Sequence, residues 1–565
     1  MPRLPIVFLF ADILVKMTSD FTIFMAQLNP VVGAIQKNMD MLVQVYNQAC
    51  AQNCDLLVTS ELLVTGYPPE DLVLKPAFQN RVERSVDDFV QTTKNQKTGV
   101  LLGTPWRVEG KLYNAALLIA DGEIKDIVLK RHMPNYGVFD EMRVFSAGTQ
   151  SHVIEFKGHR LGAMICEDMW FEDVTADLKV QNCDVLVVLN GSPFEADKPS
   201  KRYDLAKARV HEAGVALVYV NQVGGQDELV FDGGSFVVSP EGKTVCLLNH
   251  WIEDRATLTL HADGTISGPM RKDSQGLEAI YQAMCLGLRD YVNKNGFPGV
   301  VLGLSGGIDS ALSAAVAVDA LGADRVRCVM MPSPYTSKDS LDDGQGCAEY
   351  LGVAYDTVSI EPVMAAYDQM LSPLFAEREA DITEENIQSR ARGLLLMALS
   401  NKFGHMLLTT GNKSEMSVGY ATIYGDMCGG YSVLKDIYKM TVFALCKWRN
   451  AHKPVGGLGP DGPVMPENVI SKPPSAELRP DQKDEDSLPP YEILDDILEC
   501  LVEKEYSLEE VVARGHDADV VRRIWKLLDR AEYKRRQAPP GVKVTSRAFG
   551  RDRRYPLTNG FTSLI

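Results

Sequence analysis

The chain has 565 residues, which at roughly 150 residues per domain is too long for one hydrophobic core and predicts about two to four domains. Its 45% hydrophobic and 24% charged residues are typical of a globular protein and argue against a disordered chain. The 58 basic and 75 acidic residues give a net charge of −17, which disfavours nucleic-acid binding, although local N–H groups and lysines can still hold small phosphates. The eleven cysteines form no CxxC pair, so they predict buried free thiols in a reducing compartment rather than disulfides or a zinc site.

Residues 1–20 are predicted to precede the first domain as an extension. Residues 4–15 are apolar apart from Asp12, but this run is too short to span a bilayer, and no small-residue cleavage pattern follows it. Met17 stands just before an alternating strand pattern at residues 21–28, so a start at Met17 and a functional upstream segment are both open. No other stretch predicts a transmembrane helix, and we expect a cytoplasmic protein without a membrane or nucleic-acid partner.

The first half of the chain alternates short β-rich apolar runs with helical patterns. The predicted strands are 54–59, 100–103, 113–120, 161–166, 183–189 and 215–220, and the predicted helices are 38–52 and 202–213. This alternation predicts a layered α/β domain over residues 21–270. Residues 258–271 are polar and contain glycines, so we expect a linker there.

The second half repeats a strand–helix rhythm. Its predicted helices are 276–292, 311–321, 340–351 and 386–401, and its predicted strands are 299–304, 325–331, 356–360 and 405–410. Strands joined by helices in this way predict a doubly wound parallel sheet in a second domain, residues 275–565. The proline-rich segment 453–490 is either a flexible linker or a mobile lid over a site, and composition alone leaves both open.

A glycine-rich loop lies between the predicted strand 299–304 and the helix that follows it. The loop reads Gly303, Leu304, Ser305, Gly306, Gly307, Ile308, Asp309, Ser310. Two glycines without Cβ atoms let the backbone turn sharply, so its N–H groups can surround an anion at the helix N-terminus. The serines add hydroxyl donors, and Asp309 can hold Mg²⁺ against phosphate oxygens. No GxxxxGK[ST] pattern is present, so this is not a Walker loop, and a ligand-free glycine turn capping the helix is the alternative.

The SGGxDS pattern of this loop resembles the signature loop of the ATP pyrophosphatases, which include NAD, GMP and asparagine synthetases. Further segments resemble the NAD synthetases among them: 385–393, 407–415, 472–480, 484–491 and 533–543. The resemblance implies a Rossmann-like fold, ATP bound by residues 303–310 and Thr410, and a mobile substrate loop at 453–490. It also implies that Asn386, Glu415 and Lys534 bind deamido-NAD⁺, and that Asp309 and Glu415 bind Mg²⁺. Taken singly, Asn386 and Lys534 would otherwise be read as exposed helix residues.

In the first half, Glu61, Lys130 and Cys166 each stand at or just after the end of a predicted strand. A cysteine thiolate is a competent nucleophile, a nearby lysine lowers its pKa, and a glutamate can move the proton to a leaving group. Read one at a time, however, the cysteine would be a packing residue and the two charged residues would lie at the surface. The spacing alone does not bring the three together.

These segments resemble the nitrilase superfamily, whose Glu–Lys–Cys triad hydrolyses carbon–nitrogen bonds. The resemblance implies an α-β-β-α sandwich with Glu61 as general base, Lys130 as the cation beside the oxyanion and Cys166 as nucleophile. Glu141 matches an additional structural glutamate of the superfamily. In its glutamine-using members, the glutamine site corresponds to Tyr136, Ser192 and Lys198, with Arg202 as the alternative to Lys198. His132 has no implied role and is expected to be structural.

Together the two resemblances imply an enzyme that takes ammonia from L-glutamine and uses ATP to amidate deamido-NAD⁺, giving NAD⁺, AMP, pyrophosphate and glutamate. A protected ammonia tunnel and a homo-oligomer formed through the synthetase domain are implied as well. Two alternatives remain: an ATP-dependent amidotransferase with another acceptor, and a non-catalytic scaffold that keeps both folds as binding modules.

Overall fold

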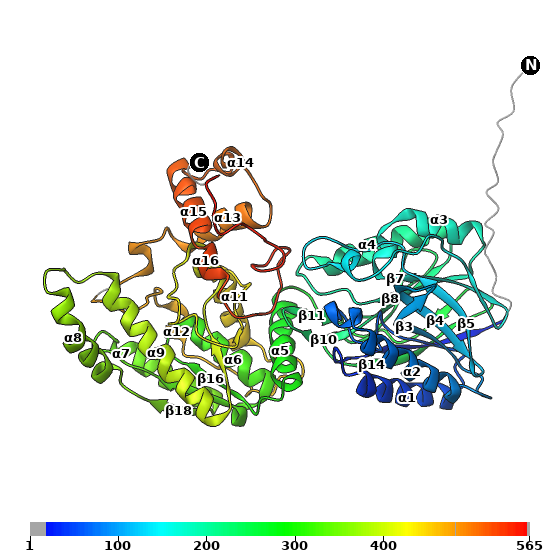
Figure 1. The fold of residues 1–565 in the computed structure, drawn as a ribbon, viewed down its shortest axis with the longest axis horizontal. Helices are drawn as coiled ribbons and strands as arrows, with labels where there is room; N and C mark the ends of the chain where they lie inside the picture. The colour runs from blue at the N-terminus through cyan, green and yellow to red at the C-terminus, as the bar shows by residue number, and fades with distance from the viewer. Residues whose placement is uncertain (1–18, 481, 562–565) are drawn as a thin grey trace, which may run out of the picture.

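The computed structural model describes residues 19–480 and 482–561, so the extension predicted for residues 1–20 lies almost wholly outside the described residues. The chain forms two layered α/β bodies that lie side by side, one from each half of the sequence (Figure 1). Five short 3₁₀ helices are described: η1 (Glu70–Leu74), η2 (Glu141–Arg143), η3 (Cys166–Trp170), η4 (Ala323–Arg325) and η5 (Asp484–Asp486). None of the described helices is both long and apolar enough to cross a membrane.

Two sheets stack face to face in the first body. One has the order β15 (Ile266–Ser267), β14 (Asp254–Leu260), β1 (Phe21–Gln27), β2 (Leu56–Val58), β3 (Gly99–Val108), β4 (Lys111–Ala120), β5 (Glu123–Leu129). The other has the order β13 (Thr244–Leu247), β12 (Phe236–Val238), β9 (Ala216–Asn221), β8 (Val185–Asn190), β7 (His159–Ile165), β6 (Ile154–Phe156). Alternate residues of both sheets, such as Ile23 and Val187, form one buried core between them.

Helices cover the outer face of each sheet. Helices α1 (Ile35–Ala51) and α2 (Pro76–Thr92) pack on the first sheet, and α3 (Glu172–Val180) and α4 (Lys198–Ala213) pack on the second. The predicted α-β-β-α sandwich is therefore confirmed. Each predicted strand and helix of this half overlaps an observed one, because the apolar periodicity marks the buried faces.

The linker expected at residues 258–271 is wrong at its start. β14 pairs with β1 along its whole length, from Phe21 opposite Leu260 to Gln27 opposite Asp254, and β15 adds an edge strand. Leu258 and Leu260 are buried, whereas the intervening Thr259 is partly exposed. The polar residues that suggested a linker therefore belong to the outer side and the turn of an edge hairpin.

A five-stranded sheet with entirely parallel pairing organises the second body. Its order is β18 (Ala354–Thr357), β17 (Val326–Met330), β16 (Val300–Gly303), β19 (Met406–Thr409), β20 (Tyr431–Ser432). The helices around it are α5 (Gly276–Lys294), α6 (Ile308–Leu321), α7 (Lys338–Leu351), α8 (Glu361–Phe375), α9 (Ile382–Phe403), α10 (Lys413–Val418), α11 (Lys439–Ala451) and α12 (Glu467–Ser471). Separate apolar clusters cover its two faces, so the predicted doubly wound sheet is confirmed.

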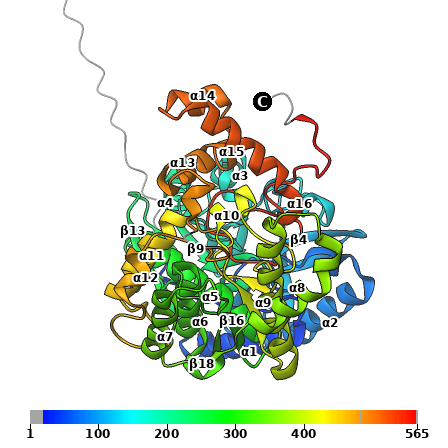
Figure 2. The same ribbon diagram turned by 90° about the vertical axis from the view of Figure 1, so that its left-hand side faces the viewer.

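Two details of the second body differ from the prediction. The strand expected at 356–360 lies earlier, at Ala354–Thr357, because Ile360 instead leads into α8, a helix that was not predicted. A small helical subdomain also follows, with its own apolar cluster: α13 (Tyr491–Val502), α14 (Leu508–Ala513), α15 (Ala518–Arg530) and α16 (Glu532–Arg535). Figure 2 shows α13, α14 and α15 stacked above the rest of this body.

The two bodies share buried contacts. Helix α5 packs on the hairpin β10 (Val223–Gln226) and β11 (Leu229–Asp232) of the first body, where Asp290 accepts from the N–H of Gly225 at 2.8 Å. The C-terminal segment runs between the bodies (Figure 1), and Lys543 Nζ lies 3.0 Å from Glu195 Oε1. Parts of the chain far apart in sequence thus hold the bodies together.

Two candidate active sites

The first site gathers residues that follow three different strands. Glu61 comes after β2, Lys130 after β5, and Cys166 opens η3 at the end of β7. Glu61 and Lys130 are fully buried and Cys166 is 6% exposed. Because these strand ends meet across the sandwich, residues 69 and 105 positions from Glu61 come together.

Lys130 lies between two carboxylates. Its Nζ donates to Glu61 Oε1 at 2.7 Å and to both carboxylate oxygens of Glu141 at 2.9 Å. Burial alone would lower the pKa of Lys130, but Glu141 and Glu61 outweigh it and raise that pKa well above its ordinary value. Both oxygens of Glu61 have further donors, since Asn114 Nδ2 donates to Oε1 at 2.7 Å and the Gly191 N–H donates to Oε2 at 2.9 Å.

Cys166 has the left-handed backbone φ of +46°, which side-chain-bearing residues seldom adopt. Burial and the charge of Glu61 raise the pKa of its thiol well above the ordinary value, and Lys130 opposes them. The resting group is therefore a thiol, which needs a base to become a nucleophile. Glu61 is the carboxylate that can serve as this base.

Two of the predicted glutamine ligands, Tyr136 and Lys198, interact with a residue that the sequence did not single out, Glu167. The Tyr136 hydroxyl donates to Glu167 Oε1 at 3.0 Å. Burial lowers the pKa of Lys198, whose Nζ lies 3.8 Å from Glu195 Oε1 and 5.5 Å from the centre of the Phe139 ring. Ser192 is buried, and its N–H donates to Asn221 Oδ1 at 3.1 Å. The position of Glu167 directly after Cys166 was the only sequence signal for it.

Arg202, the alternative to Lys198, is already occupied. It donates to both oxygens of Asp232 at 2.8 and 2.9 Å and to the carbonyl oxygens of Ser192 and Pro193 at 2.8 Å. This engagement favours Lys198 as the glutamine ligand. His132 stacks on Phe171 at a ring distance of 3.9 Å, as a structural residue would.

In the second site, the loop of residues 303–310 joins β16 to α6. Gly306 has a φ of +76°, and a Cβ there would lie 2.2 Å from the carbonyl oxygen of Ser340, so only glycine fits. The Ser310 hydroxyl donates to the Gly307 carbonyl at 2.9 Å and accepts from the Ser305 N–H at 3.2 Å. These contacts form a tight turn ahead of the helix N-terminus.

Beside this loop, Asp309 and Glu415 are bridged by Lys439, another residue that the sequence analysis missed. Lys439 Nζ lies 2.5 Å from Asp309 Oδ2 and 3.0 Å from Glu415 Oε1. Burial raises the pKa of Glu415 to about 8, with Lys439 opposing. The Lys439 ammonium thus lies between the two predicted Mg²⁺ ligands. In proteins, Mg²⁺ is commonly bound by only one or two carboxylates together with phosphate oxygens, so the carboxylates of Asp309 and Glu415 fit this ion. Among the described residues no group of three or more His, Cys, Asp or Glu forms a metal cage.

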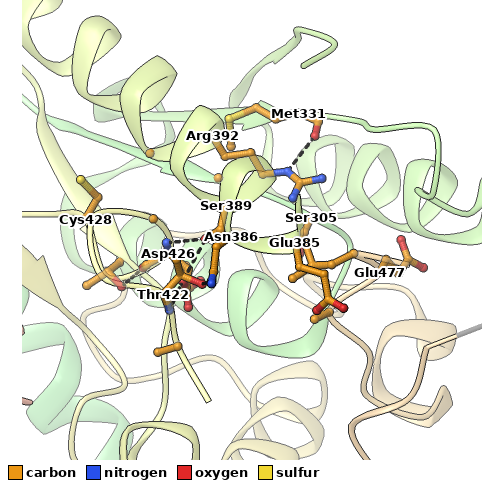
Figure 3. A pocket seen from close by; sticks show the side chains of 18 of the residues that line it. Ser305, Met331, Glu385, Asn386, Ser389, Arg392, Thr422, Asp426, Cys428 and Glu477 are labelled. Atoms are coloured by element: carbon orange, nitrogen blue, oxygen red, sulfur yellow. Dashed lines mark hydrogen bonds between the residues drawn. The ribbon is translucent and has the colours of Figure 1, made fainter. Parts of the chain in front are cut away.

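A cavity of about 370 Å³ opens next to the loop. Its lining includes Gly303, Leu304, Ser305, Asn386, Arg392, Thr410 and Lys534, whereas Glu415 lies outside it with Asp309. Asn386 Oδ1 accepts from the Thr422 hydroxyl at 2.9 Å, and Figure 3 shows both beside Asp426 on one side of the cavity. Lys534 Nζ donates to the carbonyl oxygens of Gly419 and Ala421, both at 2.7 Å.

Part of the proline-rich segment forms one wall of this cavity. Glu477 and Leu478 line it, and Glu477 Oε1 accepts from the hydroxyls of Ser337 and Ser340 at 2.7 and 2.8 Å. The Leu478 carbonyl accepts from Gln388 Nε2 at 2.9 Å. A linker free of the site would not make these contacts, so the lid interpretation is favoured over the linker.

Comparison with known proteins gives matches to both halves. A family model described as carbon-nitrogen hydrolase matches residues 22–267, and one described as NAD synthase matches residues 280–538. The glutamine-dependent NAD(+) synthetases of Acinetobacter baylyi and Rhodobacter capsulatus are 45% and 47% identical, each covering 96% of this chain and 99% of the relative. The solved glutamine-dependent NAD⁺ synthetase of Acinetobacter baumannii in complex with ADP is 42% identical, with a TM-score of 0.76 over 96% of this chain and 99% of that one. The chain therefore belongs to the glutamine-dependent NAD⁺ synthetase family.

Proposed function

We propose that the protein makes NAD⁺ from deamido-NAD⁺, ATP and L-glutamine, releasing AMP, pyrophosphate and glutamate. The observation that carries the proposal is the presence, in one chain, of the buried Glu61–Lys130–Cys166 cluster and of a glycine-rich cradle beside a cavity. The relatives with this two-part organisation are named glutamine-dependent NAD(+) synthetases, which supports the same reaction here.

In the first site, Glu61 accepts the thiol proton as Cys166 Sγ attacks the side-chain carbonyl carbon of glutamine. Lys130 stabilises the negative charge that develops on the carbonyl oxygen. The carbon–nitrogen bond then breaks, and Glu61 returns the proton to the departing ammonia. Water hydrolyses the γ-glutamyl thioester, which frees glutamate and restores the thiol.

Recognition of glutamine uses charges at the two sides of Cys166. The Lys198 ammonium is proposed to bind the α-carboxylate of glutamine, and the Glu167 carboxylate its α-ammonium group. Tyr136, which already donates to Glu167, and Ser192 complete the pocket. The two opposite charges would distinguish an amino acid from a simple amide, because each needs its own partner.

In the second site, the nicotinate carboxylate of deamido-NAD⁺ attacks the α-phosphorus of ATP and pyrophosphate leaves. The N–H groups of residues 303–310 hold the phosphates, and Lys439 neutralises charge on the leaving group. Mg²⁺ held by Asp309 and Glu415 would supply further charge neutralisation there. Asn386 and Lys534 hold the dinucleotide and Thr410 contacts ATP, so that ammonia can attack the adenylated carbonyl and displace AMP.

Ammonia must travel between the bodies without meeting bulk water. Free ammonia in neutral water becomes ammonium, which has no lone pair for attack. The two sites lie in different bodies that share the buried contacts around α5. We therefore keep a protected tunnel as part of the proposal.

The surface formed by α8 and α9, which we call the α8–α9 face, supports a homo-oligomer through the synthetase domain. In α8, which the structure describes throughout, no side chain is buried. Met370 and Leu374 are 68% and 76% exposed, and Leu394 of α9 is 66% exposed. An apolar face of this kind favours contact with a second copy of the chain.

A reducing, cytoplasmic location also belongs to the proposal. All eleven cysteines lie in the described part of the chain, and none of them is in a disulfide. Unpaired cysteines are the usual state in a reducing compartment.

Isotope labelling tests the proposed reaction. The purified protein is supplied with deamido-NAD⁺, ATP and glutamine labelled with ¹⁵N at the side-chain amide. We expect NAD⁺ carrying ¹⁵N in its carboxamide, with AMP and pyrophosphate in equal amounts. NAD⁺ without the label would refute the glutamine step, and label on a different acceptor would refute the assigned substrate.

A further inference from the structure

One buried carboxylate that the proposed mechanism does not use joins two of the segments that carry the first site. Asp168 is 2% exposed and lies in η3, two residues after Cys166. Its Oδ1 accepts from the N–H groups of Arg131 and His132 at 3.0 and 2.9 Å. Its Oδ2 accepts from the N–H of Ile165 at 3.2 Å.

The three residues that donate these N–H groups are close neighbours of Lys130 and Cys166 in the sequence. Arg131 and His132 directly follow Lys130, and Ile165 directly precedes Cys166. Since Cys166 has a φ of +46°, its backbone needs neighbours that hold it in place. The hydrogen bond from the Ile165 N–H to Asp168 holds the backbone directly before that strained position.

We propose that Asp168 is a positioning residue for glutamine hydrolysis, which ties the backbone of Lys130 to the backbone of Cys166 and so sets how Sγ approaches the Glu61–Lys130 pair. The inference rests on the proposed function. A carboxylate is suited to this task because it accepts at both ends, whereas an amide of the same shape accepts at only one. The positive charge of Lys130 also helps to stabilise the buried Asp168 carboxylate in its ionised form.

The same carboxylate is costly for the fold. Burial raises the pKa of Asp168 to about 6, against the opposing effect of the backbone N–H groups and Lys130. Because this pKa lies above the ordinary value, the folded protein binds the Asp168 proton more tightly than the unfolded chain does. The free energy of unfolding therefore falls as the pH rises from the ordinary pKa through about 6, and the full cost of the ionised group is present above pH 6.

Asp168→Asn separates a positioning role from a structural one. The amide keeps one acceptor but turns an N–H donor toward the Ile165 N–H, so the strained turn should shift. We expect glutamine-driven kcat to fall by about tenfold to a hundredfold, with the KM for glutamine within about twofold. Ammonium-driven NAD⁺ synthesis, measured on the same preparation, should stay at the wild-type rate. The matched control is Asp173→Asn, because Asp173 contacts the side chains of Arg131 and His132 and accepts a backbone N–H from Val174 rather than from residues 131, 132 or 165.

An unchanged glutamine-driven kcat in Asp168→Asn would overturn the proposal, and so would a loss confined to KM. If both nitrogen sources fail in this variant, Asp168→Glu, which keeps the carboxylate, is measured in the same two assays. Selective loss of glutamine-driven turnover in that variant supports positioning, whereas equal loss with both sources overturns it. Failure of the wild-type protein to use glutamine would instead count against the proposed function.

Discussion

At the scale of single residues, the first site depends on a charge imbalance. One ammonium, that of Lys130, faces the carboxylates of Glu61 and Glu141, and all three side chains are buried. Such a pair is costly to bury, but removing one partner is worse, because it leaves uncompensated charge in the interior. Lys130 therefore stabilises the fold of the first body besides its proposed role in the reaction.

Lys130→Met should abolish glutamine-driven synthesis and lower the free energy of unfolding by about 3–5 kcal/mol. Urea denaturation of the two proteins measures this difference. Lys125→Met is the matched control, since Lys125 lies on the adjacent strand β5 in an exposed pair with Glu123. Lys125→Met should lower the free energy of unfolding by less than about 1 kcal/mol. A similar loss of stability in both variants would contradict the interpretation of Lys130 as part of a buried ion pair.

Lys439 has the corresponding place in the second site. Lys439→Met should lower kcat by about a hundredfold to a thousandfold with ammonium as well as with glutamine, because it removes a cation from the phosphate site. Initial rates of AMP formation with both nitrogen sources test this. Lys447→Met, an exposed position on the same helix α11, should leave both rates unchanged. A loss with glutamine alone would place Lys439 outside the adenylation step.

The residues of the two sites could be predicted only in part. Glu61, Lys130 and Cys166 were found through resemblance to a known family, because their separations of 69 and 36 residues carry no local signal. Lys439 and Glu167 were missed, since a lysine after a loop and a glutamate beside a cysteine are ordinary patterns. Their importance lies in partners that only the fold brings close, Asp309 and Glu415 for one and Tyr136 for the other.

At the scale of elements, the segment that holds Glu477 links the cavity to α7. Glu477 has a φ of +49° and accepts from Ser337 and Ser340, at the start of that helix. Glu477→Gln would replace one acceptor with a donor, so the wall of the cavity should loosen. We expect the KM for deamido-NAD⁺ to rise by about threefold to tenfold, with a smaller change in kcat. Glu467→Gln, exposed on α12, is the control, and equal effects of the two changes would contradict a specific role.

Elements with a continuous run of buried apolar residues were predicted well, and elements with few or no buried side chains were not. The central strands β8 and β16 have continuous buried runs, which the sequence shows directly. β14 was hidden because only one of its faces is buried, so its polar residues suggested a linker. α8 gave no signal of a buried face because none of its side chains is buried.

At the scale of the whole molecule, the α8–α9 face predicts an assembly. Leu374→Glu places a charge on this apolar face, and it should shift the protein to a smaller species in sedimentation analysis at micromolar concentration. Val180→Glu, 81% exposed on α3 of the first body, is the control and should not change the mass. A wild-type protein that sediments as a monomer would contradict the proposed oligomer.

The joint action of the two bodies is the central claim, and Cys166→Ala tests it most directly. NAD⁺ formation is measured for the wild-type and variant proteins with deamido-NAD⁺ and ATP, supplied with either glutamine or ammonium chloride. We predict that the wild-type protein uses both sources, while the variant uses only ammonium, at the wild-type rate. Glutamine-driven synthesis by the variant would exclude Cys166 as the nucleophile, and loss of synthesis with both sources would contradict two separate sites.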